Sequence, residues 1–80
     1  MDTQVAKLFG IALRARRLAK NISQQELAFA SSLDRTYVSL LERGLRQPSL
    51  TTIINISCAL DIQPWILIKD LCKIQKSELD

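Results

Sequence analysis

Apolar residues recur along this chain at intervals of three and four residues, the spacing that places side chains on one face of an α-helix. No segment alternates apolar and polar residues as a half-buried strand does. Capping and turn residues divide the pattern into five predicted helices, over residues 5–20, 24–31, 35–43, 50–60 and 64–77. The sequence therefore predicts an all-α fold in which residues 1–80 form a single domain.

The predicted helix boundaries depend on caps, because the chain contains only two glycines and two prolines. Ser23 with Glu26 three residues later forms a capping box at the start of the second helix. Asp34 and Ser49 occupy the positions expected for the N-caps of the third and fourth helices. Gly44 can adopt the left-handed conformation that ends the third helix.

The last two helices carry most of the remaining apolar residues. One stripe of the fourth helix is predicted to face the core, and it consists of Leu50, Ile53, Ile56 and Leu60. The fifth helix is apolar on more than one face, and a monomer of this size can cover only one of them. We therefore predict that residues 64–77 contribute to dimerisation, with Trp65, Ile68 and Leu71 at the interface. Ile66 and Leu67 are the alternative set, since either set can face the core.

Two short helices joined by a three-residue link, residues 32–34, are typical of a helix-turn-helix, whose second helix enters the major groove of DNA. In the predicted second helix of this pair, Val38 and Leu41 face inward. Arg35 can bond a guanine through two hydrogen bonds, and Thr36 and Ser39 can contact neighbouring bases. We predict that Arg35, Thr36 and Ser39 read bases.

Candidate contacts to the DNA backbone flank this helix on both sides. They are polar or basic side chains that can donate to phosphate oxygens. The set comprises Ser23, Gln24, Tyr37, Arg43, Arg46, Gln47 and Ser49. Residues 1–48 contain eight Lys and Arg against four Asp and Glu, whereas residues 49–80 contain three Lys against four acidic residues. A basic first part suits a polyanionic partner, although ordinary solvated surface residues also produce this pattern.

Three stretches of the sequence resemble the Cro/C1-type (XRE-family) helix-turn-helix regulators. They are ISQQELA at residues 22–28, LDRTYVS at residues 33–39 and LERG at residues 41–44. The second stretch and the short fifth helix are especially similar to the controller proteins of restriction–modification systems, which are dimeric regulators that time endonuclease expression. The resemblance implies a compact five-helix, lambda-repressor-like domain that binds a pseudo-palindromic operator in double-stranded DNA as a homodimer.

The resemblance also implies roles for individual residues. It supports the base-reading set above and the phosphate contacts of Arg46 and Gln47, with Gln24 contacting the DNA backbone or a base. It pairs Arg17 with Glu42 as a structural ion pair that fixes the first helix against the third. The family usually has glycine where this chain has Ser32 and Asp61. Left-handed backbone at either residue costs about 1 kcal/mol relative to glycine.

The residues give less support to an enzyme, a metal-binding protein or a protein-interaction module. The chain has no histidine, and neither of its two cysteines lies beside a base, so we predict no catalytic residues and no enzyme activity. We expect no metal site, no cofactor and no small-molecule ligand. The alternative is a protein-interaction module on the same fold, such as an antitoxin or coactivator domain. RNA polymerase is a further candidate partner of a transcriptional regulator.

The sequence also indicates where the protein acts. The longest apolar runs have four residues, whereas a membrane span needs about 20. Residues 1–4 provide no basic region of the kind that begins a secretory signal. We therefore expect a cytoplasmic, bacterial-type protein that has no membrane partner.

Overall fold

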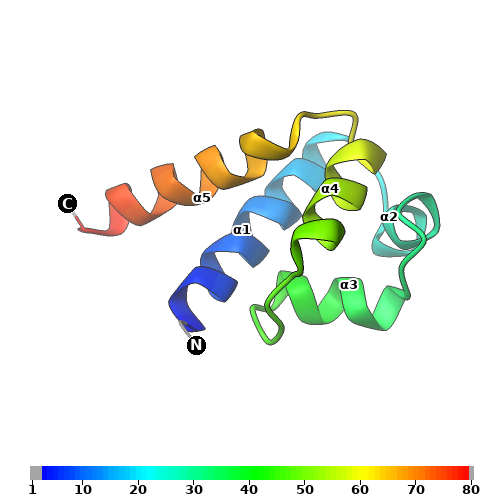
Figure 1. The fold of residues 1–80 in the computed structure, drawn as a ribbon, viewed down its shortest axis with the longest axis horizontal. Helices are drawn as coiled ribbons and strands as arrows, with labels where there is room; N and C mark the ends of the chain where they lie inside the picture. The colour runs from blue at the N-terminus through cyan, green and yellow to red at the C-terminus, as the bar shows by residue number, and fades with distance from the viewer. Residues whose placement is uncertain (1–2, 80) are drawn as a thin grey trace.

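The computed structural model describes residues 3–79 and contains five helices in the described chain. They are α1 (Thr3–Ala19), α2 (Gln24–Ala30), α3 (Arg35–Glu42), α4 (Leu50–Ala59) and α5 (Pro64–Leu79). Each end lies within two residues of its predicted position. In Figure 1, α2, α3 and α4 lie to one side of α1, while α5 runs along α1 and its C-terminal end extends past the other helices. The all-α prediction is confirmed.

Side-chain caps define the starts of two helices as predicted. The Ser23 hydroxyl accepts from the Glu26 N–H at 3.0 Å, and the Glu26 carboxylate accepts from the Ser23 N–H at 3.0 Å. The Ser49 hydroxyl accepts from the Thr52 N–H at 3.0 Å. Asp34 occupies the N-cap position of α3 but makes no side-chain capping hydrogen bond there, so that part of the prediction is wrong. The Asp34 carboxylate is left exposed at the start of α3.

Left-handed residues reverse the chain between helices. Asn21, Ser32 and Asp61 have φ values of 59°, 58° and 57°, and Gly44 has a φ of 73°. Ser32 and Asp61 are thus left-handed at the two positions where the resemblance implies glycine. In the turn between α2 and α3, the Leu33 N–H reaches back to the Ala28 carbonyl at 2.8 Å. This bond ties the turn back to the end of α2.

The core forms where α1 packs against α3 and α5. It contains Leu8, Phe9, Leu13, Leu27, Ala28, Val38, Leu41, Ile56, Leu60, Leu67 and Leu71. Helix α4 contributes Ile56 to this core, and Ile53 is partly buried against it. Leu50, predicted to face the core, is 75% exposed instead. It belongs to a second stripe with Ile54, four residues later on the same face, and both side chains are exposed.

The backbones of α1 and α3 approach closely at Gly10. A Cβ atom at this position would lie 2.5 Å from the carbonyl oxygens of both Leu41 and Glu42. Only a residue without a side chain allows this separation, so Gly10 sets the distance between α1 and α3. On the other side of α1, Arg16 forms an ion pair with Asp70 of α5, with its Nε 2.6 Å from Oδ2.

None of the single helices among residues 3–79 combines the length and the apolar character of a membrane span. Taken together, Leu50–Ala59 and Pro64–Ser77 meet both conditions, with a bend of 103° between them.

Candidate nucleic-acid interface

One face of α3 is exposed and polar, and the opposite face is buried. Val38 and Leu41 are fully buried and anchor the helix to the core. Arg35 and Thr36 are exposed, and Ser39 is half-buried. Because residues three and four apart share a helix face, the three predicted base-reading residues point away from the core together. In the described chain Arg35 makes no ion pair, so its guanidinium is available to an outside acceptor.

A buried ion pair fixes α3 to α1. The Arg17 Nε donates to Glu42 Oε2 at 2.6 Å, and a second guanidinium nitrogen donates to Glu42 Oε1 at 3.0 Å. Arg17 also donates to the Ile22 carbonyl at 2.9 Å, which connects α1 to the turn before α2. The hydrogen bond to Glu42 raises the pKa of Arg17, so the guanidinium stays charged. The pair implied by the resemblance is therefore present, and it joins α1, α3 and the α1–α2 turn.

Gln24 lies beside this ion pair. Its side-chain Nε2 donates to Glu42 Oε1 at 3.1 Å. Glu42 Oε1 thus accepts hydrogen bonds from both Arg17 and Gln24. Sequence patterns alone placed Gln24 at the DNA backbone but did not indicate its contact with Glu42.

The other residues predicted to contact the DNA backbone fall into two groups. Arg43, Arg46 and Gln47 are exposed at the end of α3 and in the loop that follows. Ser23 and Ser49 are exposed, yet their hydroxyls already serve as N-caps of α2 and α4. Ser49 is further engaged, because its hydroxyl lies 2.9 Å from the hydroxyl of Thr52.

Tyr37 differs from these residues, because it is half-buried and packs against the core cluster. Its ring therefore helps to seat α3 on the domain. We keep its hydroxyl as a predicted contact to the DNA backbone.

The exposed apolar face of α5 differs from the predicted one in one residue. Trp65 is 62% exposed and Ile68 is 44% exposed. Leu71 is only 8% exposed and belongs to the core of its own protomer. It lies six residues after Trp65, a separation that turns its side chain about 120° away around the helix. Cys72, seven residues after Trp65, is exposed and continues the face instead.

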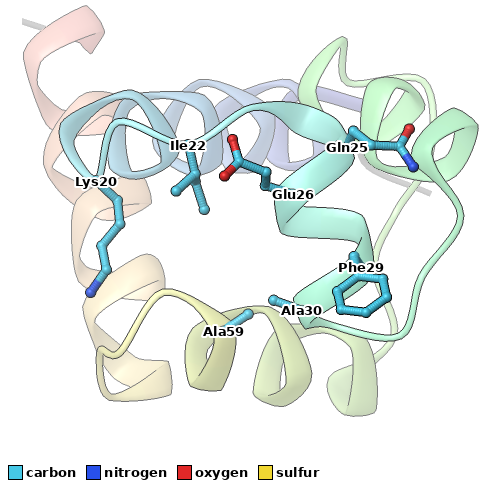
Figure 2. Close-up of a pocket in the computed structure, with 7 residues that line it drawn as sticks. All are labelled: Lys20, Ile22, Gln25, Glu26, Phe29, Ala30 and Ala59. Carbon is cyan, nitrogen blue, oxygen red and sulfur yellow. The ribbon is translucent and has the colours of Figure 1, made fainter.

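An apolar groove of about 540 Å³ lies outside this interface, between α2, the α1–α2 turn and the end of α4. Figure 2 shows Lys20 and Phe29 at its two sides, with Ile22, Ala30 and Ala59 between them. Phe29 is 87% exposed. The sequence analysis missed this groove. The available signal was an aromatic residue on the polar side of a short helix.

Comparison with known proteins identifies the kind of domain that carries this site. The Helix-turn-helix family HTH_3 matches residues 13–64, from the second half of α1 to the first residue of α5. The chain belongs to the helix-turn-helix family. It is a DNA-binding transcriptional regulator and not an enzyme.

Individual members of the helix-turn-helix family match most of the chain. Control protein C.BamHI of Bacillus amyloliquefaciens is 49% identical over 65 residues, which are 80% of this chain and 80% of that protein. The restriction-modification controller protein C.AhdI from Aeromonas hydrophila is 50% identical with a TM-score of 0.76, covering 78% of this chain and 94% of that one.

A third match is the controller protein C.Esp1396I, solved as a tetramer with its natural 35 base-pair operator. It has a TM-score of 0.79 and 29% identity, and covers 86% of this chain and 91% of that one. These likenesses confirm the resemblance to Cro/C1-type regulators and to controller proteins among them.

Proposed function

We propose that this protein is a controller-type regulator that binds a pseudo-palindromic operator as a homodimer. The exposed face of α3, opposite its fully buried face, is the observation that carries the proposal. Each α3 enters a major groove, and the two half-sites lie about 34 Å apart, one turn of the duplex. The names of C.BamHI and C.AhdI, and the operator complex of C.Esp1396I, support the assignment to restriction–modification control.

The predicted contacts divide into two roles. Arg35 reads a guanine, and Thr36 and Ser39 contact neighbouring bases, so these residues supply specificity. Arg43 and Arg46 contact phosphates and supply much of the affinity, because each contact releases condensed counterions. Ser23, Gln24, Tyr37, Gln47 and Ser49 add neutral hydrogen bonds to the backbone.

Arg35→Ala and Arg46→Ala, compared on the same DNA, test this division. The operator is first selected from a random DNA pool by the wild-type protein. Arg35→Ala should lose about 1–3 kcal/mol of discrimination at one base position, because one base contact is removed. Arg46→Ala should weaken binding about equally on all sequences and reduce the salt slope by about 1. Equal weakening on all sequences by Arg35→Ala would contradict its base-reading role.

The dimer is proposed to form through the exposed face of α5. Trp65 and Ile68 are large, exposed and adjacent on this helix, as anchors of an interface are. Leu71 supports this face from the core rather than reaching across it. Trp65→Ala should shift the protein towards monomer in analytical ultracentrifugation. Phe29→Ala is the matched control, because it removes a more exposed aromatic side chain from α2 and should leave the dimer intact. An unchanged dimer in Trp65→Ala would remove α5 from the interface.

The proposal places the protein in the bacterial cytoplasm, where the operator DNA is. RNA polymerase is the further proposed partner, and the exposed Phe29 of α2 is a position at which to test for it, because no residue of α3 lines the groove beside Phe29. Transcription from an operator-linked promoter, measured with and without Phe29→Ala, tests this contact separately from DNA binding. An unchanged transcript level would exclude Phe29 from it.

A further inference from the structure

Glu42 sits at a junction between the core and the edge of the nucleic-acid interface. Its side chain is 3% exposed, and its Oε1 accepts one hydrogen bond from Arg17 and one from Gln24. Gln24 is only half-buried, so its amide bridges the buried pair and the surface. This inference rests on the proposed function, in which Gln24 contacts the DNA backbone.

The chemistry of the carboxylate fixes the orientation of the Gln24 amide. A carboxylate can only accept hydrogen bonds, so Gln24 must present its NH₂ group, and not its carbonyl, to Glu42. An NH₂ group has two hydrogens, and this contact uses one of them. A phosphate oxygen also only accepts, so the second N–H is the group that Gln24 can offer to DNA.

The negative charge of Glu42 must be balanced by its other hydrogen-bond partner, Arg17. An uncompensated carboxylate near the interface would repel phosphate, but two hydrogen bonds from Arg17 neutralise Glu42. Arg17 therefore lets Glu42 hold Gln24 without repelling the DNA.

We propose that Glu42 is a positioning residue for DNA binding, which acts by holding the Gln24 side chain with one N–H directed to a backbone phosphate. Free glutamine side chains sample several rotamers, and ordering one on binding costs affinity. Glu42 orders Gln24 before the DNA arrives. Its role in binding is thus distinct from its role in joining α1 to α3.

The test combines three variants in a double-mutant cycle on the selected operator. Gln24→Ala should lose about 10-fold in affinity, as expected for one hydrogen bond to a charged group. Arg17→Met with Glu42→Leu replaces the buried pair by apolar residues, a change that buried pairs often tolerate without loss of folding. This variant should lose about the same factor of 10, because Gln24 is no longer held. Combining all three substitutions should cost no more than either change alone.

The salt dependence separates positioning from a displaced α3. Gln24 is neutral, so losing its contact releases no fewer counterions, and the slope of log affinity against log salt should stay that of the wild type. A shifted α3 would also lose arginine contacts and reduce that slope. Gln25→Ala, at the exposed next residue of α2, is the matched control and should bind as the wild type does.

Other results would overturn the proposal. Wild-type affinity in the Arg17→Met/Glu42→Leu variant would show that Glu42 does not position Gln24, and multiplicative losses in the triple variant would show that the two act independently. If the apolar variant does not fold, NMR of the free wild-type protein tests the contact between Gln24 and Glu42 directly. The two side-chain amide protons of Gln24 should then differ in solvent exchange, and equally fast exchange would refute the contact. Failure of the wild-type protein to bind any duplex would instead refute the proposed function.

Discussion

Replacing Gly10 by alanine tests the close packing of α1 on α3. The new Cβ would lie 2.5 Å from the carbonyl oxygens of Leu41 and Glu42 and 2.9 Å from the Glu42 carbonyl carbon. An ordinary contact needs roughly 3.4 Å or more, so the two helices must separate by about 1 Å. These neighbours are backbone atoms and cannot rotate away as a side chain would.

Two opposing effects set the magnitude. Alanine favours a helix over glycine by about 1 kcal/mol. Overpacking typically costs about 1–3 kcal/mol, and the rigid neighbours here favour the upper end. We expect Gly10→Ala to lower the free energy of unfolding by about 2 kcal/mol, which lowers Tm by roughly 8–16 °C in a domain of this size.

Thermal and urea unfolding followed by circular dichroism measure this change, at one protein concentration because a dimer gains stability by mass action. Ala15→Gly is the matched control, since Ala15 is exposed on α1 and reports helix propensity alone. It should lose about 1 kcal/mol. A higher Tm for Gly10→Ala than for the wild type would show that propensity prevails and that α1 and α3 are not in the described contact.

Two further predictions concern α5. The hydrogen bond from Arg16 lowers the pKa of Asp70 below its ordinary value of 3.8. The ion pair therefore stabilises the fold above pH 3.8, and this contribution is lost as the pH falls through the lowered pKa of Asp70 in the folded protein. Asp70→Asn should remove this acid-dependent part, at most about 1 kcal/mol because the Arg16 side chain is 39% exposed, and unchanged acid unfolding would contradict it. Leu67→Ala should cost about 2–5 kcal/mol in urea unfolding, because Leu67 is fully buried, whereas Ile68→Ala should cost less in the monomer; equal losses would contradict the assigned faces.

The helices and the helix-turn-helix could be predicted from the sequence because their signals are local. Ser23 with Glu26, Ser49 and Gly44 act within one turn of their own position, so the sequence alone locates the ends of the helices. The exposed polar face of α3, which is predicted to read bases, follows from the same local periodicity, with Val38 and Leu41 as its buried counterparts. The residue run that resembles Cro/C1-type regulators added the Arg17–Glu42 pair, which periodicity could not have found.

The choice between two apolar stripes could not be made from the sequence. In α4, Leu50 and Ile54 form one stripe and Ile53 and Ile56 form another, and both have helical spacing. Which stripe is buried depends on where α2 and α5 lie, and that is a property of the whole fold. The ion pair between Arg16 and Asp70 joins residues 54 positions apart, so no local pattern indicates it.

The left-handed backbone at Ser32 and Asp61 makes this domain less stable than it would be with glycine at the same positions. Each holds a side-chain-bearing residue in a conformation that glycine adopts at a cost about 1 kcal/mol lower. Because neither residue belongs to α3, a lineage or a protein engineer can improve them without replacing a predicted base-reading residue. Substitutions that alter operator preference usually destabilise a protein, and these two positions can compensate for such losses. The domain can thus acquire new sequence specificity while it keeps its fold.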